Sequence, residues 1–541
     1  MDGGQATPGL ESTRLVERRI VALCGSHRLR WPRLVNKRLA ALANLAFSSG
    51  NALLTLVAGL LLVPLYLRHF DMATYGAWLA SGSVIAAIGL FESGLSTVLT
   101  RRLAAAHAAA DSAQFAHLAT SGILLAVFFG GFAALLGCAL APFAPAWVHA
   151  PLAQRAALTH AMQLCSFAAG GSILYLSIGA IPQAWQQTII ANLIGTLAFL
   201  MNVVVIVLGL HLGWGVVALG AGRLALALTQ IGGYAWYLWI QWGQKSLAWP
   251  RPSVRLVREV WSEASNLLLS QIANTISGNL ESFVAAALIA PEAAAVISLT
   301  GRVVSTVRMF LERIGSAVFA GMVILGEGLD RSSYHRVLVE FFTISASLAG
   351  LGLGCALAFS SSIIPLWVGP TAFGGIWLLA LIAAGDALGF RKGLFVTLVI
   401  AGGRTRAAAR ISIVEALVRP VLLLGAAVGL GLLGIPLATL LANLVPVVLL
   451  SHVLRAQSGV SLTTQWLPGI KTFMCGLVAG VVALELMPPL HSWPSLGIAF
   501  FGFASLLLTL TLAIDRGWRT TARANVGLLH RRRLATAGEA P

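Results

Sequence analysis

Long apolar runs alternate with short polar connections along nearly the whole chain. Since a helix needs about 20 apolar residues to cross the roughly 30 Å hydrocarbon core of a bilayer, runs of this length predict membrane-spanning helices. The pattern predicts fourteen of them, at residues 40–66, 76–97, 118–145, 158–182, 188–210, 214–240, 262–289, 293–322, 337–366, 374–401, 411–432, 436–454, 468–487 and 495–514.

An apolar unit of about 220 residues occurs twice, and such a repeat fixes the architecture. Four pairs of positions mark it: Asn44 with Asn266, Trp147 with Trp367, Pro182 with Gly403, and Gly213 with Gly434. Because six spans correspond to six, both copies cross the membrane in the same direction, related by a pseudo-two-fold axis along the membrane normal. We therefore expect an all-α polytopic membrane protein with two six-helix lobes in parallel repeat and two extra C-terminal helices.

The repeat and the polar connections together divide the chain. The expected parts are a basic cytoplasmic segment 1–38, a first lobe 39–240, a cytoplasmic linker 241–261, a second lobe 262–456, two further spans within 467–515, and a basic cytoplasmic tail 516–541.

Composition supports a membrane protein, since 58% of the residues are hydrophobic and only 10% are charged, against about 25% charged in soluble domains. The formal net charge of +17 comes from basic residues on alternate connections. The connections predicted to lie inside carry Arg101, Arg102, Arg251, Arg255, Arg258, Arg331, Arg336, Arg404, Arg406 and Arg410. This bias predicts that both termini are cytoplasmic, and it makes a nucleic-acid partner unnecessary.

The sequence lacks the motifs of several enzyme classes. It contains no G-x-x-x-x-G-K-[ST] loop for nucleotide phosphates, no H-E-x-x-H zinc motif and no D-x-D pattern, and its five cysteines form no C-x-x-C pair. We expect no enzymatic activity, no cofactor and no metal. A proton or sodium gradient remains as a driving force.

Charged residues inside the predicted spans are the candidates for function, because charge is costly there and usually faces a cavity. The candidates for a substrate-binding cavity are Arg302, Arg313, Arg223, Arg391, Lys392 and Arg419, and those for ion coupling or inter-lobe pairing are Glu92, Glu281 and Asp386. Guanidinium groups bind carboxylate or diphosphate oxygens in pairs. The pattern therefore predicts an anionic substrate.

Structural roles compete with these assignments. Arg313, Arg391 and Lys392 lie near enough to helix ends to reach lipid headgroups. The pairs Arg308 with Glu312 and Glu415 with Arg419 have the i,i+4 spacing of ion pairs along one helix. Under the repeat, Glu92 corresponds to Arg313, which predicts that these two residues pair between the lobes.

Several short motifs carry a resemblance to a known family. They are Val63-Pro64-Leu65-Tyr66-Leu67, Gly89-Leu90-Phe91-Glu92-Ser93-Gly94-Leu95, Gly301-Arg302-Val303 and Leu366-Trp367-Val368-Gly369. The chain resembles the Wzx-type flippases of lipid-linked O-antigen and exopolysaccharide units, in the multidrug/oligosaccharidyl-lipid/polysaccharide exporter superfamily. The resemblance implies a multidrug-transporter-like fold with two lobes that alternate between inward-open and outward-open states in a bacterial inner membrane.

The resemblance also implies a substrate and partners. The substrate would be an undecaprenyl-diphosphate-linked oligosaccharide, moved from the cytoplasmic to the periplasmic leaflet, with membrane lipids, a polysaccharide polymerase and assembly proteins as further partners. The alternatives are a lipid II flippase or a multidrug/cation antiporter of the same superfamily, a scaffold for polysaccharide assembly, and a membrane-embedded polymerase or ligase. The last of these normally needs a large outer loop, which the sequence lacks.

Overall fold

The computed structural model describes residues 37–88, 91–244, 250–313, 331–487 and 490–514, and every regular element in these ranges is helical. Contacts divide the chain into residues 1–54 and 55–541. Of the first unit, residues 37–54 are described, and they form the beginning of helix α2 (Lys37–His69). The expected basic segment 1–38 and tail 516–541 lie almost entirely outside the described residues.

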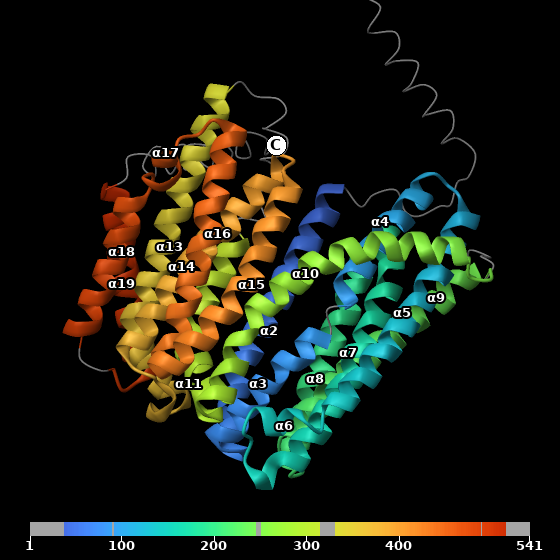
Figure 1. The fold of residues 1–541 in the computed structure, drawn as a ribbon, viewed down its shortest axis with the longest axis horizontal. Helices are drawn as coiled ribbons and strands as arrows, with labels where there is room; N and C mark the ends of the chain where they lie inside the picture. The colour runs from blue at the N-terminus through green and yellow to red at the C-terminus, as the bar shows by residue number, and fades with distance from the viewer. Residues whose placement is uncertain (1–36, 89–90, 245–249, 314–330, 488–489, 515–541) are drawn as a thin grey trace, which may run out of the picture. The chain divides into compact units, whose positions relative to one another are not determined.

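The first lobe continues from α2 through helices that lie side by side in the blue to green part of Figure 1. They are α3 (Met72–Ile88), α4 (Phe91–Ala108), α5 (Ser112–Leu140), the short α6 (Ala144–Trp147), η1 (Leu152–Gln154), α7 (Arg155–Ala184), α8 (Thr188–His211) and α9 (Val217–Gln244).

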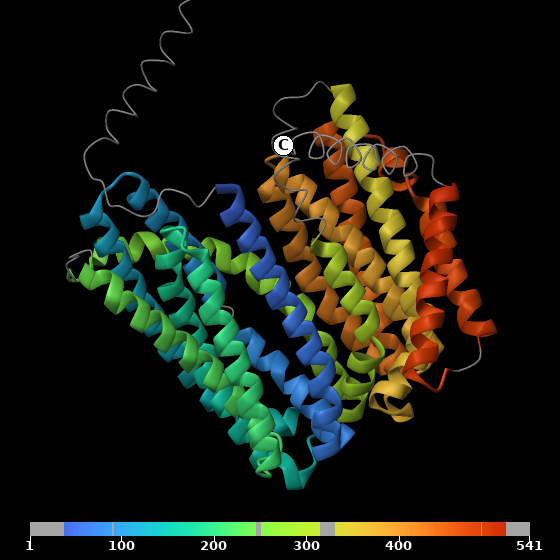
Figure 2. The same cartoon turned by 180° about the vertical axis from the view of Figure 1, so that it is seen from behind.

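The second lobe repeats this order from α10 onward, and Figure 2 shows its yellow and orange helices from behind. Its elements are α10 (Val254–Leu288), α11 (Pro291–Thr300), a helix Arg302–Arg313, α13 (Arg331–Val368), η2 (Pro370–Ala372), α14 (Ile376–Ala401), α15 (Thr405–Leu430), η3 (Gly431–Leu433) and α16 (Gly434–Ser458). The chain continues with α17 (Leu462–Trp466), α18 (Ile470–Leu486) and α19 (Trp493–Ile514).

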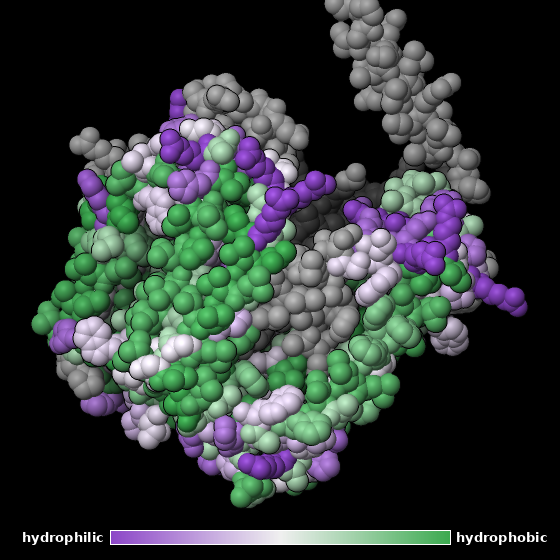
Figure 3. Space-filling view, viewed as in Figure 1, coloured by the Kyte–Doolittle hydropathy of each residue, from purple (hydrophilic) through white to green (hydrophobic). Residues whose placement is uncertain are grey.

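In the described residues, each of the fourteen expected spans coincides with a helix or a pair of helices, which confirms the fold class. Residues 314–322 of the expected eighth span lie outside the described part. By length and apolar character alone, six helices of the described part are long enough to cross a membrane, or seven if a bent pair counts as one span. On the face drawn in Figure 3, hydrophobic residues cover the middle of the helices and hydrophilic residues gather toward their ends. A band of this kind is expected of helices that face lipid.

The second span of the second lobe differs from the continuous helix that the apolar pattern predicted. There, α11 and the helix Arg302–Arg313 meet at Gly301 with a bend of 53°. Gly301 forms the C-cap of α11. In the first lobe the expected second span covers α3 and α4, and residues 89–90 between them lie outside the described part. Under the repeat, Gly301 corresponds to a position inside α3, which is one helix from Met72 to Ile88.

Glycines bring the helices of each lobe into backbone contact. In the first lobe, α5 packs along α7, and a Cβ added at Gly130 would lie 2.5 Å from the carbonyl oxygen of Gly170. In the second lobe, α13 packs along α18, where Gly350 and Gly354 face Gly476. Small residues allow this approach, which supplies the van der Waals contact that holds helices together in lipid.

Two further contacts join elements of different lobes. Helix α10 packs against α3 and α4 as well as against α15. Pro64 lies inside α2 and has no N–H to donate to the carbonyl of Leu60. The Nε1 atom of Trp367, at the end of α13, donates a hydrogen bond of 2.6 Å to that Leu60 oxygen.

Candidate functional site

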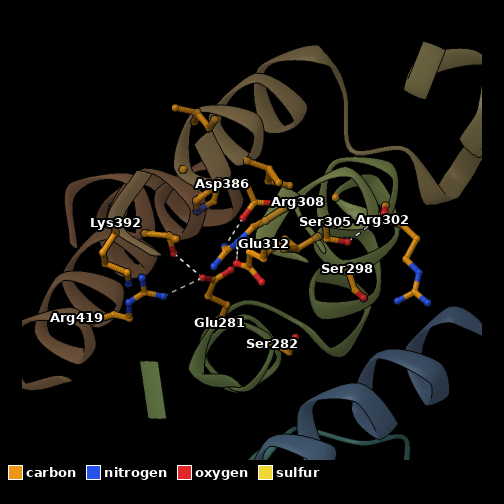
Figure 4. Close-up of a pocket in the computed structure, with 17 residues that line it drawn as sticks. Glu281, Ser282, Ser298, Arg302, Ser305, Arg308, Glu312, Asp386, Lys392 and Arg419 are labelled. Atoms are coloured by element: carbon orange, nitrogen blue, oxygen red, sulfur yellow. Dashed lines mark hydrogen bonds and ion pairs between the residues drawn. The ribbon is translucent and has the colours of Figure 1, made fainter. Parts of the chain in front are cut away.

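A polar cavity of about 710 Å³ lies within the second lobe. Residues of α10, α11, the helix Arg302–Arg313, α14, α15 and α16 line it, and Figure 4 shows their side chains. Seven of the lining residues carry charge in their ordinary state: Glu281, Arg302, Arg308, Glu312, Asp386, Lys392 and Arg419. Such a concentration of charge among otherwise apolar helices identifies this cavity as the candidate site.

One group of ion pairs centres on Arg308. Its Nε atom donates to Glu312 Oε1 at 2.8 Å, and its Nη1 atom donates to Asp386 Oδ1 at 2.7 Å. The first pair has the i,i+4 spacing that the sequence indicated, and the second joins the helix Arg302–Arg313 to α14. Arg308 therefore holds one wall of the cavity together.

A second group of ion pairs centres on Glu415, whose side chain is 6% exposed. Lys392 Nζ lies 2.6 Å and Arg419 Nη2 lies 3.2 Å from Glu415 Oε1. Arg419 also reaches Glu281 Oε1 on α10 through Nη1, at 3.4 Å. Because each of these buried bases pairs with at least one carboxylate, the attraction offsets part of the cost of removing the charges from water.

Two neutral side chains of α16 complete this network. Asn443 accepts hydrogen bonds from Lys392 at 3.0 Å and from Arg419 at 2.8 Å, and it donates to the Gly385 carbonyl at 3.1 Å. The Thr439 hydroxyl donates to Glu281 Oε1 at 2.7 Å. The sequence prediction missed both residues, although their i,i+4 spacing in an apolar span was a signal that they share one face.

The charges of these networks nearly balance. Three bases, Arg308, Lys392 and Arg419, face the four carboxylates Glu281, Glu312, Asp386 and Glu415. The sequence prediction of a cationic cavity therefore changes, since most of its positive charge is matched by acids from neighbouring helices.

Arg302 is the exception among the bases that line the cavity. In the part of the chain that the structure describes, it forms no ion pair, and its buried Nε atom has no hydrogen-bond partner. Its side chain extends away from the paired residues (Figure 4) and approaches α2, where a Cβ added at Gly59 would lie 2.7 Å from Arg302 Nη2. The glycine leaves room for the guanidinium group.

A second cavity, of about 540 Å³, lies among α3, α7 and α9 of the first lobe. Arg223 is exposed on its wall beside Cys165, Tyr175 and Trp78. Ser282 of α10 lines this cavity as well as the polar cavity of the second lobe. The two cavities therefore meet at α10, and Arg223 and Arg302 contribute guanidinium groups from different lobes.

The remaining predicted site residues lie elsewhere. Arg391 lines neither of these cavities but a separate apolar one, although its neighbour Lys392 lines the polar cavity. Arg313 is exposed and lines neither cavity. Glu92 lies in α4, but its side chain is outside the described residues, so the pairing of Glu92 with Arg313 stays a prediction. The described residues contain no cluster of three or more side chains suited to a metal ion.

Comparisons with known proteins agree with this architecture. Residues 41–320 match the family model described as polysaccharide biosynthesis protein. Among curated proteins, no sequence matches the chain. The structure of a lipid II flippase, MurJ, in an inward closed conformation is 12% identical in sequence, with a TM-score of 0.66 over 87% of this chain and 98% of that chain.

Multidrug transporters share the same fold. An inward-facing multidrug resistance transporter of the MATE family, in the MOP superfamily, is 13% identical, with a TM-score of 0.59 over 80% of this chain and 95% of that chain. The eukaryotic MATE transporter AtDTX14 is 13% identical, with a TM-score of 0.53 over 81% of this chain and 97% of that chain. At such identities the likeness establishes the fold alone.

Proposed function

Because the chain belongs to the polysaccharide biosynthesis protein family, we propose that it is a flippase for an undecaprenyl-diphosphate-linked oligosaccharide. It would move this lipid from the cytoplasmic to the periplasmic leaflet of a bacterial inner membrane, with both of its own termini in the cytoplasm. A polysaccharide polymerase and assembly proteins would receive the product. The protein itself would bind and release the lipid without catalysing a reaction.

The observation that carries this proposal is the state of Arg302. Its guanidinium lines the polar cavity with no ion pair among the described residues, while Arg308, Lys392 and Arg419 are engaged. A diphosphate offers oxygens in the geometry that a guanidinium binds bidentately. Arg302 is therefore the group most available to an anionic headgroup.

Arg223 supplies a second cation from the facing lobe. The two cavities meet at Ser282, so a substrate that extends from one to the other contacts both lobes. Alternating access requires such contacts, since a ligand shifts a conformational equilibrium only through its different interactions with the two states. The polyprenyl chain would remain in the lipid beside the protein.

Ion coupling would use the carboxylates of the second lobe. Glu281 binds Arg419 and Thr439 at the cavity wall, and Asp386 binds Arg308. A proton or sodium ion at Glu281 would compete with Arg419, which retains Glu415 and Asn443 as partners. In this proposal, ion binding neutralises Glu281 and releases Arg419 from that carboxylate, so that the cavity gains one positive charge.

The test is complementation of a strain that lacks its oligosaccharide flippase. We expect Arg302→Ala to abolish surface polysaccharide while the protein remains abundant in the membrane, and Arg302→Lys to retain part of the activity because the positive charge remains. Arg336→Ala is the matched control, since Arg336 is exposed on α13 and lines neither cavity. Normal polysaccharide with Arg302→Ala would refute the assignment.

Two alternative functions, a lipid II flippase and a multidrug/cation antiporter, have the same fold. Because the charges of the polar cavity nearly balance, the cavity charge alone does not decide between them and our proposal. A lipid II flippase would rescue cells depleted of their own lipid II flippase. A multidrug/cation antiporter would raise the resistance of sensitive cells to cationic drugs. Our proposal expects neither effect from the wild-type protein when it is expressed at the level that restores surface polysaccharide.

A further inference from the structure

The two lobes differ in how their third and fourth spans pack. In the first lobe α5 packs closely along α7, whereas in the second lobe α13 touches α14 at few points and packs along α18 instead. Counting along the repeat from the pair Pro182 and Gly403, Gly170 of α7 corresponds to Arg391 of α14. The position of Gly170, which permits the close contact of α5 with α7, is thus occupied by Arg391 in the second lobe.

The space between α13 and α14 is an apolar slot of about 280 Å³. Small residues form two of its sides, with Ala346 and Ala349 on α13 and Ala387 on α14. Phe473 and Leu477 of α18 face them. The slot shares no lining residue with the polar cavity. It is therefore a separate site, and its function does not depend on the substrate proposed above.

Arg391 is the charged residue of this slot. Its guanidinium carbon lies 4.7 Å from the ring centre of Phe342, 5.0 Å from that of Phe395 and 5.3 Å from that of Trp466. Aromatic faces attract a cation and fix its position. They do not accept the hydrogen bonds of the five guanidinium N–H groups in the manner of an oxygen.

The hydrogen bonds of Arg391 are correspondingly incomplete. Its Nε and Nη2 atoms are buried without a partner in the described residues, and no carboxylate of those residues pairs with it. A buried charge left in this state is costly. An anionic oxygen that enters the slot would compensate that cost.

The surroundings of the slot carry further positive charge. A neighbouring cavity of about 570 Å³ shares Ile470 with the slot and includes exposed His335 and Lys471 among its lining residues, together with several threonines. The short helix α17 contributes residues to both. An apolar slot beside basic and hydroxyl groups matches a molecule with an apolar chain and an anionic head.

We propose that this slot binds an anionic glycerophospholipid of the surrounding membrane. The lipid phosphate would accept hydrogen bonds from Arg391, one acyl chain would lie against the alanines of α13 and α14, and Lys471 would add attraction at the mouth. Basic pockets between transmembrane helices recognise anionic headgroups in this way. The lipid would fill the space that close helix packing fills in the first lobe.

The test uses the full-length protein, delipidated in a neutral detergent. Phosphatidylglycerol and phosphatidylcholine of matched chain length are titrated separately, and the rise in melting temperature and the lipids retained in native mass spectrometry are measured. We expect the wild-type protein to prefer phosphatidylglycerol, and Arg391→Met to weaken its apparent affinity about tenfold, as expected for one charge-assisted hydrogen-bonded contact. Arg406→Met, an exposed arginine on α15, is the control and should keep the preference.

A second variant covers the case in which Arg391→Met fails to fold. Ala387→Leu keeps the guanidinium but narrows the slot, so it should also lose the preference for phosphatidylglycerol. The proposal is overturned if the folded slot variants respond to phosphatidylglycerol as the wild type does. It is equally overturned if a polyprenyl phosphate, and not phosphatidylglycerol, gives the Arg391-dependent response. Because no transport is measured, failure here leaves the flippase proposal untouched.

Discussion

The two lobes have the same order of helices but differ in how they are held together. The first relies on small residues, as where Gly130 and Gly170 bring α5 and α7 into contact. The second places α13 on α18, a helix without a counterpart in the first lobe, and leaves a slot beside α14. A repeated fold therefore tolerates a change of packing partner, provided that another helix covers the exposed face.

The lobes also differ in where they carry charge. In the repeat marked by the pairs Pro182 with Gly403 and Gly213 with Gly434, Glu415 corresponds to Ile194 and Arg419 corresponds to Ala198. The buried ion pair of Glu415 and Arg419 therefore has apolar counterparts in the first lobe. In the first-lobe cavity, Arg223 is the charged lining residue of the described part. The described part of the second lobe therefore holds a network of buried ion pairs at positions where the first lobe has apolar side chains.

The largest expected effect tests this charge difference. Glu415→Gln removes the carboxylate shared by Lys392 and Arg419, and we expect a loss of about 3 to 5 kcal/mol in stability, as for other broken buried ion pairs. Thermal unfolding in detergent measures it. Glu485→Gln, on the exposed surface of α18, is the control. Adding Lys392→Met to Glu415→Gln should recover part of the loss; no recovery would argue against a shared role of this carboxylate.

A smaller effect tests the packing of the first lobe. Gly130→Val places side-chain atoms against the Gly170 carbonyl, so α5 must move away from α7, at a cost of about 1 to 3 kcal/mol. Gly131→Val is the matched control, because a Cβ there meets nothing within 4 Å. Thermal unfolding of both variants measures the difference. Equal melting temperatures would show that the close contact contributes little.

The smallest effect concerns the ion pairs where α10 meets α4. Glu259 accepts hydrogen bonds from Arg255 at 2.9 Å and from Arg102 at 3.1 Å, and Glu263 pairs with Arg101 and Arg102. The hydrogen bond from Arg255, then that from Arg102, holds the pKa of Glu259 below its ordinary value of 4.5. The stabilisation is therefore present above that value and is lost as the pH falls through the lowered pKa.

The lowered pKa of Glu259 predicts how the melting temperature depends on pH. The melting temperature of the wild-type protein should fall slightly more than that of Glu259→Gln as the pH is lowered through and below 4.5, and high salt should reduce the difference between them. A larger drop for Glu259→Gln would contradict the pairing. Because these residues are partly exposed, the effect should be the smallest of the three.

The sequence predicted the parts of this structure that depend on local spacing. Apolar runs located the helices, and the i,i+4 spacing identified the pairs Arg308 with Glu312 and Glu415 with Arg419, both of which are confirmed. The pairs of Lys392 with Glu415 and of Arg308 with Asp386 join different helices. They could not be predicted, because they depend on which helices are neighbours and how each is rotated.

Rotation about one helix also explains why Arg391 and Lys392 lie in different cavities. Consecutive residues of an α-helix point about 100° apart, so two adjacent bases cannot share one face. The sequence prediction placed both in a single group because both are charged residues within one expected span. The bend at Gly301 was not predicted, because Thr300, Gly301 and Arg302 interrupt the apolar run only briefly and it resumes at Val303.

The hydrogen bond from the Trp367 indole to the Leu60 carbonyl makes a movement of α2 depend on access of water to this carbonyl. Pro64 leaves the Leu60 carbonyl without its helical partner, and the indole of Trp367 replaces that partner at 2.6 Å. If α2 moves away from α13 during transport, this oxygen must find a water molecule or remain bare, at a cost of about 1 to 3 kcal/mol. Water at this point would then be part of the opening step, and a dry interface would resist it.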